Sequence, residues 1–296
     1  MARILITGGK GALGRWMAER LRADDPLAPA FPGPHEVWAP GRDELDVTLR
    51  QPCQEKVAGF KPDVFFNCAA YTAVDKAEEQ KTEAYRINRD GAGYAAESAR
   101  KAGARFIHFS TDYVFPGTRS DPYAEEDPPH PINVYGASKL GGELKVMSLC
   151  PDHAILRTAW LYGPYGPNFV RTIVKLARTE KELRVVEDQW GSPTFVPDLA
   201  AAAFHAARLG LKGKYHVCNE GVITWHEFAT AVVAGAGLTT PVTPIVTEDF
   251  PRPARRPAYS ALNCMKIRRT KFEIRDWKAA LDDFFRMAKE GKADPL

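Results

Sequence analysis

A glycine-rich loop close to the N-terminus constrains the fold of this chain more than any other feature of its sequence. It occupies residues 7–14 (TGGKGALG), after an apolar, strand-like run at Ala2–Thr7 and before a helical stretch at Ala12–Leu21. Glycine permits a tight turn and lets the backbone approach a pyrophosphate closely, while the start of a helix offers that anion free N–H groups and a positive dipole. The loop therefore predicts a dinucleotide site, with contacts from Gly8, Lys10, Gly11, Ala12, Leu13 and Gly14.

Segments with strand and helix character alternate along the first half of the chain. The strand-like segments lie at 37–39, 63–68, 105–110 and 154–159, and the helical ones at 83–101 and 133–149. A proline-rich segment, Asp24–His35, is predicted as a long loop. The alternation is typical of a parallel sheet with helices on both faces. We predict an α/β fold with a Rossmann-type, doubly wound parallel sheet.

The pattern becomes less regular after Gly163, which indicates a second domain. Residues 197–208 are predicted to form a helix that returns to the sheet, followed by a strand at 215–218. Helices are also expected at 169–178, 225–234 and 277–289. We assign 1–163 and 197–221 to the dinucleotide-binding domain. A smaller, mostly C-terminal substrate-binding domain takes 164–196 and 222–296.

Composition excludes several classes of protein. No apolar run approaches the roughly 20 residues that cross a bilayer, and the first apolar stretch ends at Gly8, too short for a signal peptide. We therefore expect a cytoplasmic protein. The net charge of +3 is too small to indicate nucleic-acid binding and is compatible with an anionic substrate. The five cysteines are scattered without a CxxC pair, which predicts neither a zinc site nor a disulfide framework.

A tyrosine and a lysine four residues apart, Tyr135 and Lys139, lie on one face of a predicted helix. Tyrosine titrates near pH 10, and a nearby ammonium favours the phenolate, so Lys139 is expected to lower the pKa of Tyr135. Tyr135 could then act as a proton donor. Thr111 ends the preceding strand, at the edge where parallel sheets bind ligands, and could hydrogen-bond a substrate carbonyl. We predict Thr111, Tyr135 and Lys139 as the catalytic residues.

These three residues match the Ser/Thr–Tyr–Lys triad of short-chain dehydrogenases, and further segments resemble dTDP-4-dehydrorhamnose reductases. The similar segments run through nearly the whole chain, at 67–76, 109–117, 134–143, 156–163, 168–170, 188–194 and 256–262. The resemblance implies NADPH-dependent reduction of the C4 keto group of a dTDP-linked 4-keto-6-deoxy sugar. The substrate would be dTDP-4-dehydro-L-rhamnose and the product dTDP-L-rhamnose.

The resemblance also implies roles for individual residues. Besides Tyr135 and Lys139, implied cofactor contacts are Asp46, Val47, Ala69, Ala70 and Tyr71. Implied substrate contacts are Thr72, Val74, Thr111, Asp112, Tyr113, Trp160, Asn168 and Arg256. Two of these residues could have a structural role in place of a substrate contact: Val74 could simply pack against its neighbours, and Trp160 could be an aromatic residue of the core. Asn88 is expected to be a structural polar group that links strands.

The end of the second predicted strand bears on the choice of cofactor. An NAD enzyme usually places an acidic residue there, on the ribose 2′-hydroxyl, but this chain has Ala39-Pro40-Gly41-Arg42. Arg42, with Lys10, could meet a 2′-phosphate. We therefore predict NADPH over NADH. The alternative is that Arg42 is a solvated surface residue.

Other functions remain open from the sequence. One is a related 4-keto-sugar reductase, epimerase or dehydratase; dehydratases of this superfamily add Asp-Glu after the catalytic threonine, whereas here Asp112-Tyr113 follows. Another is a non-catalytic subunit like the regulatory β subunit of methionine adenosyltransferase. Some reductases of the family use Mg²⁺ at a dimer contact. Glu187 and Asp188 are adjacent and point to opposite faces of an extended segment, so we predict no required metal. A homodimer is compatible with the sequence.

Overall fold

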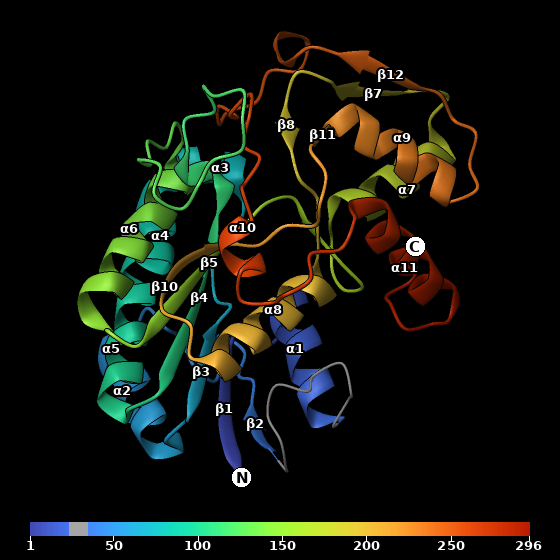
Figure 1. Ribbon diagram of the computed structural model, residues 1–296. Coiled ribbons are helices and arrows are strands. Elements are labelled where there is room, and N and C mark those ends of the chain that lie inside the picture. The colour runs from blue at the N-terminus through green and yellow to red at the C-terminus, as the bar shows by residue number, and fades with distance from the viewer. Residues whose placement is uncertain (24–34) are drawn as a thin grey trace.

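A computed structural model describes residues 1–23 and 35–296 (Figure 1). Its centre is a six-stranded sheet in the order β10-β5-β4-β3-β1-β2, in which every adjacent pair is parallel. The strands are β1 (Ala2–Thr7), β2 (His35–Trp38), β3 (Val64–Asn67), β4 (Arg105–Thr111), β5 (His153–Thr158) and β10 (Gly213–His216). The chain runs outward from β1 to β2 and then crosses to β3, so a crevice opens between the carboxyl ends of β1 and β3. The predicted doubly wound, Rossmann-type sheet is confirmed.

Helices cover both faces of this sheet. The helices α1 (Ala12–Arg22) and α8 (Val196–Leu209) lie on one face, and α2 (Arg50–Phe60), α5 (Ala92–Ala102) and α6 (Val134–Leu149) on the other (Figure 1). Successive side chains of a strand point to opposite faces. Accordingly, Ile4 and Ile6 of β1 join the apolar cluster with α1 and α8, whereas Leu5 joins the cluster with the other three helices. All three are fully buried, which explains why the strand is apolar without alternation.

Some elements differ from their sequence predictions. The sequence does not predict α2, because Pro52 stands in its first turn and only Cys53 and Val57 are buried, so its apolar periodicity is weak. The helix predicted at 83–101 is a run of α4 (Lys81–Tyr85), a π-helical turn (Arg86–Gly91) and α5. The strand β10 lies two residues earlier than predicted. Of the predicted proline-rich loop, His35 starts β2, and the remainder lies outside the described residues.

The second half of the chain adds a smaller region beyond the carboxyl edge of the sheet (Figure 1). Its main elements are α7 (Phe169–Thr179), β7 (Leu183–Val186), β8 (Trp190–Gly191), β11 (Ile223–Thr224), α9 (Trp225–Gly235), β12 (Val242–Ile245) and α11 (Trp277–Lys289). Shorter elements of the second half are β6 (Leu161–Tyr162), β9 (Thr194–Phe195), a 3-10 turn (Thr247–Asp249) and α10 (Met265–Arg268). The first half contributes α3 (Val74–Glu79) and a 3-10 turn (Asp112–Val114). The ring of Phe195 stacks on Tyr162 and meets Phe284 of α11 edge-on. One apolar cluster therefore continues from the α8 face of the sheet into this region.

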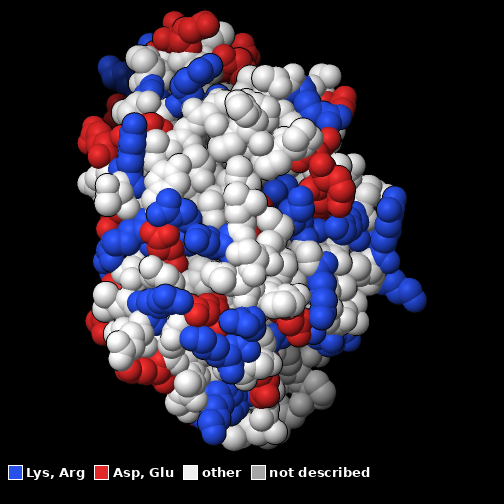
Figure 2. Space-filling view, turned by 90° about the vertical axis from the view of Figure 1, so that its left-hand side faces the viewer, with Lys and Arg blue, Asp and Glu red and all other residues white. Residues whose placement is uncertain are grey.

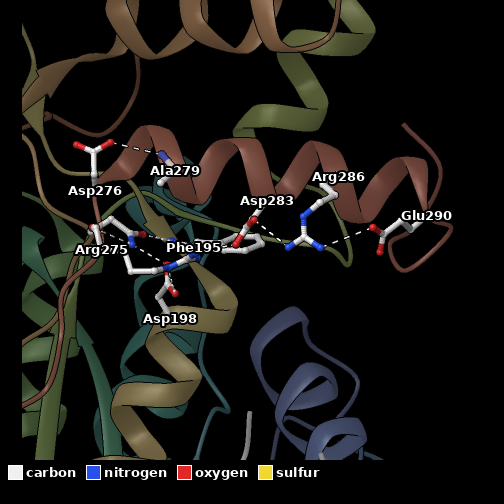
Figure 3. Close-up of polar contacts among 9 residues, drawn as sticks. Phe195, Asp198, Arg275, Asp276, Ala279, Asp283, Arg286 and Glu290 are labelled. Atoms are coloured by element: carbon white, nitrogen blue, oxygen red, sulfur yellow. Dashed lines mark hydrogen bonds and ion pairs between the residues drawn. The ribbon is translucent and has the colours of Figure 1, made fainter. Parts of the chain in front are cut away.

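The last helix, α11, is fastened to α8 by a chain of ion pairs (Figure 3). Arg275 donates to Asp198 of α8 at 2.9 and 3.0 Å, and its third nitrogen donates to Asp283 at 2.6 Å. Arg286 then pairs with Asp283 at 2.9 Å and with Glu290 at 3.6 Å. The C-terminal helix is thus tied to the helix that packs on the sheet.

In the described part of the chain, no helix combines the length and the apolar character that a bilayer span requires. Figure 2 shows the face formed by the left-hand helices of Figure 1. Lysine and arginine side chains there are interspersed with aspartate and glutamate around an uncharged central area, so the charge of this face is mixed.

Candidate active site

A cleft of about 570 Å³ opens at the carboxyl edge of the sheet, where the ends of β1, β3, β4 and β5 meet the start of α1 and one face of α6. The predicted site residues that line it are Gly8, Lys10, Gly11, Ala12, Leu13, Gly14, Ala70, Thr72, Thr111, Asp112, Tyr135, Lys139, Trp160 and Asn168. The predicted residues outside its lining are Arg42, Asp46, Val47, Ala69, Tyr71, Val74, Tyr113 and Arg256. The cleft thus brings the three predicted catalytic residues together with the glycine loop.

The glycine loop forms a tight turn between β1 and α1. Gly8 has a φ of +68°, and its carbonyl accepts the N–H of Gly11 at 2.9 Å. A Cβ on Gly14 would lie 2.4 Å from the oxygen of Gly8, so only glycine allows this approach. Gly11 precedes α1 and supplies no side-chain cap, which leaves N–H groups of the first turn available to a ligand. These features fit a pyrophosphate at the start of α1.

The helix α6 presents Tyr135 and Lys139 to the cleft, one turn apart. Its start is fixed by two side chains. Asn133 accepts a backbone N–H of the first turn at 2.8 Å, and Glu78 accepts the first N–H of the helix at 2.8 Å. Because these caps satisfy groups that a helix leaves unpaired, they define where α6 begins and hence where Tyr135 points.

Burial shifts the pKa values of Tyr135 and Lys139. It raises the pKa of Tyr135 to about 12, although a hydrogen bond with Thr111 acts in the opposite direction. It also lowers the pKa of Lys139 to about 8, against the attraction of Glu143. The ammonium of Lys139 donates to the carbonyl of Phe109 at 2.6 Å. The expected lowering of the Tyr135 pKa is therefore wrong for the protein alone, because burial outweighs the hydrogen bond with Thr111 and the charge of Asp112 raises the pKa further. The phenol keeps its proton at neutral pH.

Thr111 connects the tyrosine to a buried carboxyl group. Its hydroxyl donates to Asp112 Oδ1 at 2.9 Å and accepts the N–H of Tyr113 at 3.2 Å. Burial raises the pKa of Asp112 to about 6, against hydrogen bonds with Ser260 and Thr111. Tyr135, Thr111 and Asp112 thus form one hydrogen-bonded series. The hydroxyl groups of Tyr135 and Thr111 therefore lie next to each other in the lining of the cleft.

Asn88 stands in the π-helical turn and connects one wall of the cleft to α6. Its side chain accepts the N–H of Tyr71 at 2.8 Å and donates to the carbonyl of Tyr71 at 3.0 Å and to Ser138 Oγ at 2.9 Å. Gly142 permits the close approach of α6 to this turn, since a Cβ there would lie 2.2 Å from the backbone oxygen of Asn88. Asn88 is therefore structural, but it links the segment after β3 to α6, and the prediction that it links strands is wrong.

Arg256 belongs to an ion-pair cluster with Asp75 of α3. Its Nη2 donates to Asp75 at 3.0 Å, and Arg252 donates to the same carboxylate at 2.7 Å. These contacts, with that of Arg256 the strongest, hold the pKa of Asp75 well below its usual range. Arg256 also contacts the hydroxyl of Tyr113, whose ring meets that of Tyr135 edge-on at 5.9 Å. The cluster therefore joins α3 and residues 252–256 beside the predicted catalytic tyrosine.

The predicted cofactor contacts after β2 lie outside the lining of the cleft. Arg42 is 62% exposed and pairs with Asp46 at 3.2 Å, and Lys10 pairs with Asp43 at 2.8 Å. Val47 is buried in the apolar cluster beneath α2. Both cations are themselves exposed, and an ion pair open to water costs little to break, so both could turn toward a phosphate.

Trp160 and Asn168 connect the sheet to the smaller region. Trp160 has a φ of +46°, and its ring stacks on Trp225 with centroids 3.6 Å apart. A Cβ on Gly191 would lie 2.6 Å from this ring. Asn168 caps α7 and donates to the carbonyl of Gly163 at 3.0 Å. Trp160 therefore lines the cleft and also packs in the apolar core.

Comparison with known proteins identifies the family. The model of the RmlD substrate binding domain matches residues 2–289. The chain is also 41% identical over 295 residues to a dTDP-4-dehydrorhamnose reductase of Aggregatibacter actinomycetemcomitans, covering 95% of this chain and 97% of the relative. The chain belongs to the dTDP-4-dehydrorhamnose reductase family.

Two further relatives are informative. A crystal structure of dTDP-4-dehydrorhamnose reductase from Bacillus anthracis in complex with NADP matches with a TM-score of 0.91 and 38% identity, over 97% of this chain and 99% of that one. A probable dTDP-4,6-dihydroxy-2-methyloxan-3-one 4-ketoreductase of Streptomyces antibioticus is 39% identical over 96% of this chain and 94% of the relative. Proteins similar to this chain thus include ketoreductases named for different sugars.

Several residues of this family member line the cleft without having been singled out by sequence reasoning. They are Asn67, Cys68, Phe109, Ser110, Thr158, Ala159, Leu161, Tyr162, Gly163, Tyr165, Gly166, Pro167, Val196 and Leu199. A signal for two of them was available, because Asn67 and Thr158 end β3 and β5 at the same edge as Thr111. Cys68, Phe109 and Ser110 lie at the ends of β3 and β4 at this same edge. The others enter through the segment between β5 and α7 and through the start of α8, and the sequence does not specify that these segments close over the cleft.

The described residues contain no cluster of metal-ligating side chains. No group of three or more His, Cys, Asp or Glu side chains that could hold a metal ion occurs within residues 1–23 and 35–296. Asp188 accepts the N–H of Thr247 at 2.9 Å and its hydroxyl at 2.7 Å. The independence of metal stays a prediction.

Proposed function

We propose that this protein uses NADPH to reduce the C4 keto group of dTDP-4-dehydro-L-rhamnose to the alcohol of dTDP-L-rhamnose. The observation that carries the proposal is the meeting of Tyr135, Lys139 and Thr111 with the glycine loop in one cleft. The names of the relatives support the substrate, and the NADP in the Bacillus anthracis structure supports the cofactor. Such a product would serve the synthesis of cell-surface polysaccharide.

In this proposal, each catalytic residue has one task. The dinucleotide, when bound, supplies the hydride that forms the new C–H bond at C4. Tyr135, which burial keeps protonated, donates its proton to the oxygen that receives the carbonyl π electrons. Thr111 orients that oxygen through its hydroxyl. The ammonium of Lys139 then stabilises the phenolate that remains on Tyr135.

Cofactor choice follows from the residues after β2. We propose NADPH rather than NADH, because Arg42 and Lys10 are exposed cations whose ion pairs, with Asp46 and Glu83 and with Asp43, are open to water on the cation's side. Both cations could form charge-assisted hydrogen bonds with a 2′-phosphate, which NADPH carries and NADH lacks. Catalytic efficiency should be higher with NADPH than with NADH; equal values with the two would contradict this choice.

The two regions divide the binding between them in this proposal. Residues 1–163 and 197–221 hold the dinucleotide, and 164–196 and 222–296 hold the sugar nucleotide. Trp160 and Asn168 stand at the junction, and Arg256 and Tyr113 lie next to the reactive tyrosine. The homodimer and the cytoplasmic location stay predictions.

The test is an assay of purified protein with NADPH and dTDP-4-dehydro-L-rhamnose. Absorbance at 340 nm follows NADPH, and NMR identifies the sugar product. In the Tyr135→Phe variant, kcat/KM should fall at least about 100-fold, because the proton donor is removed and the ring is kept. Full activity of this variant, at unchanged thermal stability, would exclude Tyr135 as the donor.

A second candidate is reduction of a related nucleotide-linked 4-keto-6-deoxy sugar, which the Streptomyces antibioticus relative favours. A panel of such sugars, compared by kcat/KM, separates the two. Net release of one NADP⁺ per sugar distinguishes a reductase from an epimerase that retains its cofactor. Cofactor binding without turnover of any sugar would favour a non-catalytic subunit.

A further inference from the structure

A buried carboxylate lies one helical turn beyond Lys139 on α6. Glu143 accepts hydrogen bonds from Nε and Nη2 of Arg157 on β5 at 2.8 and 2.6 Å. The side chain of Arg157 is 1% exposed, and that of Glu143 is 0% exposed. Ser110 of β4 donates a further hydrogen bond to Glu143 at 2.5 Å. The pair therefore lies between α6 and the sheet, directly behind the cleft.

Stability alone does not explain an ion pair in this place. Removing two charges from water costs as much as their attraction returns in many proteins, and apolar residues of similar volume often serve packing equally well. Arg157 needs further support from the sheet, where its guanidinium lies 5.0 Å from the ring centroid of Phe115 and 3.5 Å from His216 Nε2. Glu143 differs from other buried charged groups in its position on α6. It lies four residues after Lys139, and residues four apart on a helix are neighbours.

Lys139 depends on its surroundings to keep its charge in the buried site. Of its three N–H donors, one is used by the carbonyl of Phe109. We propose that Glu143 is a positioning residue for the reduction: its charge, one helical turn away, keeps Lys139 charged, while Arg157 and Ser110 keep Glu143 in place. The inference deepens the proposed function and rests on it for its kinetic readout.

The other titratable groups that face Lys139 cannot replace this charge. Burial raises the pKa of the Cys68 thiol, at the end of β3, and keeps it neutral. Burial, with Lys139 itself, lowers the pKa of His108 on β4 well below its usual value, so the imidazole is also neutral. Tyr135 is protonated at neutral pH. Among the described residues that face Lys139, Glu143 therefore supplies the negative charge.

The charge of Glu143 determines in which direction the pKa of Lys139 should move. Burial lowers the pKa of Lys139 to about 8, and the charge of Glu143 opposes this. Without that charge, the pKa of Lys139 would fall further. Because the ammonium is needed in the reduction, activity declines as the pH rises through this pKa. Loss of the charge of Glu143 should therefore move the decline to lower pH.

The experiment is the pH profile of kcat/KM for NADPH-dependent reduction by the full-length protein and its Glu143→Gln variant. This profile reports the groups of the free enzyme. The alkaline decline of Glu143→Gln should lie about one pH unit below that of the unsubstituted protein. A double variant, Glu143→Gln with Arg157→Met, also removes the unopposed guanidinium and should shift less. It keeps the test available if the single variant does not fold.

A matched control is Glu97→Gln on α5. Glu97 is also largely buried and binds two cations, Arg50 and Lys101, but it lies outside the lining of the cleft. Its pH profile should not move. An unchanged profile for Glu143→Gln with reduced thermal stability would overturn the proposal and leave a structural role.

A second readout does not need the reaction. The titration of Lys139 can be followed by NMR of protein labelled with ¹³C at lysine Cε, with the signal assigned through Lys139→Met. The midpoint should fall in Glu143→Gln; an unmoved midpoint overturns the inference. If the unsubstituted protein reduces no sugar while the midpoint falls, the proposed function fails and the coupling of Glu143 to Lys139 stands.

Discussion

Two clefts of this molecule share the helices α1 and α8 but hold their charged groups differently. The cleft at the sheet edge has about 570 Å³, and a second cleft of about 360 Å³ lies between α1, α8 and α11. In the first, Tyr135, Lys139 and Asp112 are buried, and burial shifts the pKa of each. In the second, arginines and carboxylates neutralise one another, as the chain from Asp198 to Arg286 shows (Figure 3).

The difference shows what burial does to an ion pair. The side chains of Arg275 and Asp283 beside the second cleft are 38% and 31% exposed, whereas Arg157 and Glu143 behind the first are 1% and 0% exposed. Water and salt screen an exposed pair, which then mainly fastens one helix to another. A buried pair acts through a medium of low dielectric constant, so its charges reach their neighbours more strongly. Arg157→Met and Asp283→Asn test this contrast, and Gly14→Ala tests the tight loop that lines the first cleft.

The largest effect is expected from Arg157→Met. It leaves the carboxylate of Glu143 buried without its cation, and breaking such a pair typically costs about 3–5 kcal/mol of unfolding free energy. Urea denaturation at pH 7 measures the loss. The double variant with Glu143→Gln should recover part of it, since no unpaired charge remains. A loss below about 1 kcal/mol would show that the buried pair behaves like an exposed one.

A smaller effect is expected from Gly14→Ala in the dinucleotide loop. The added Cβ would lie 2.4 Å from the backbone oxygen of Gly8, and overpacking of this kind costs about 1–3 kcal/mol. NADPH affinity, measured by calorimetry, should fall because the loop must move. Gly59→Ala on α2 is the matched control, with open space around its Cβ. That variant should gain about 0.5–1 kcal/mol and bind NADPH as before.

The smallest effect is expected from Asp283→Asn beside the second cleft. Burial of Asp283 is outweighed by its hydrogen bonds with Arg286 and Arg275, so its pKa lies below the usual value. The stabilisation is then present above the unfolded pKa of about 3.9 and disappears as the pH falls through the folded pKa. Asp283→Asn should cost at most about 1 kcal/mol at pH 7 and nothing at strongly acidic pH. Reductase activity should not change; a large loss of activity would show that the two clefts are coupled.

Much of the active cleft could be predicted from local sequence. The glycine spacing, the four-residue interval between Tyr135 and Lys139 and the place of Thr111 after a strand all depend on contacts within one element or between neighbours in a parallel sheet. The helix α2 could not be predicted in the same way, because Pro52 and the small apolar face conceal it. The lowered pKa expected for Tyr135 was wrong because it depended on the extent of burial, which local spacing does not specify.

The sequence by itself determined the alternating α/β architecture and the dinucleotide loop, and it predicted which side chains take part in the reaction, since these follow from backbone geometry and short-range periodicity. Only the tertiary structure decided that Glu143 meets Arg157 and Ser110 behind Lys139, and that Asn88 reaches α6 through a π-helical turn. The physical reason is that these contacts join segments whose separation in space is set by the packing of the helices on the sheet.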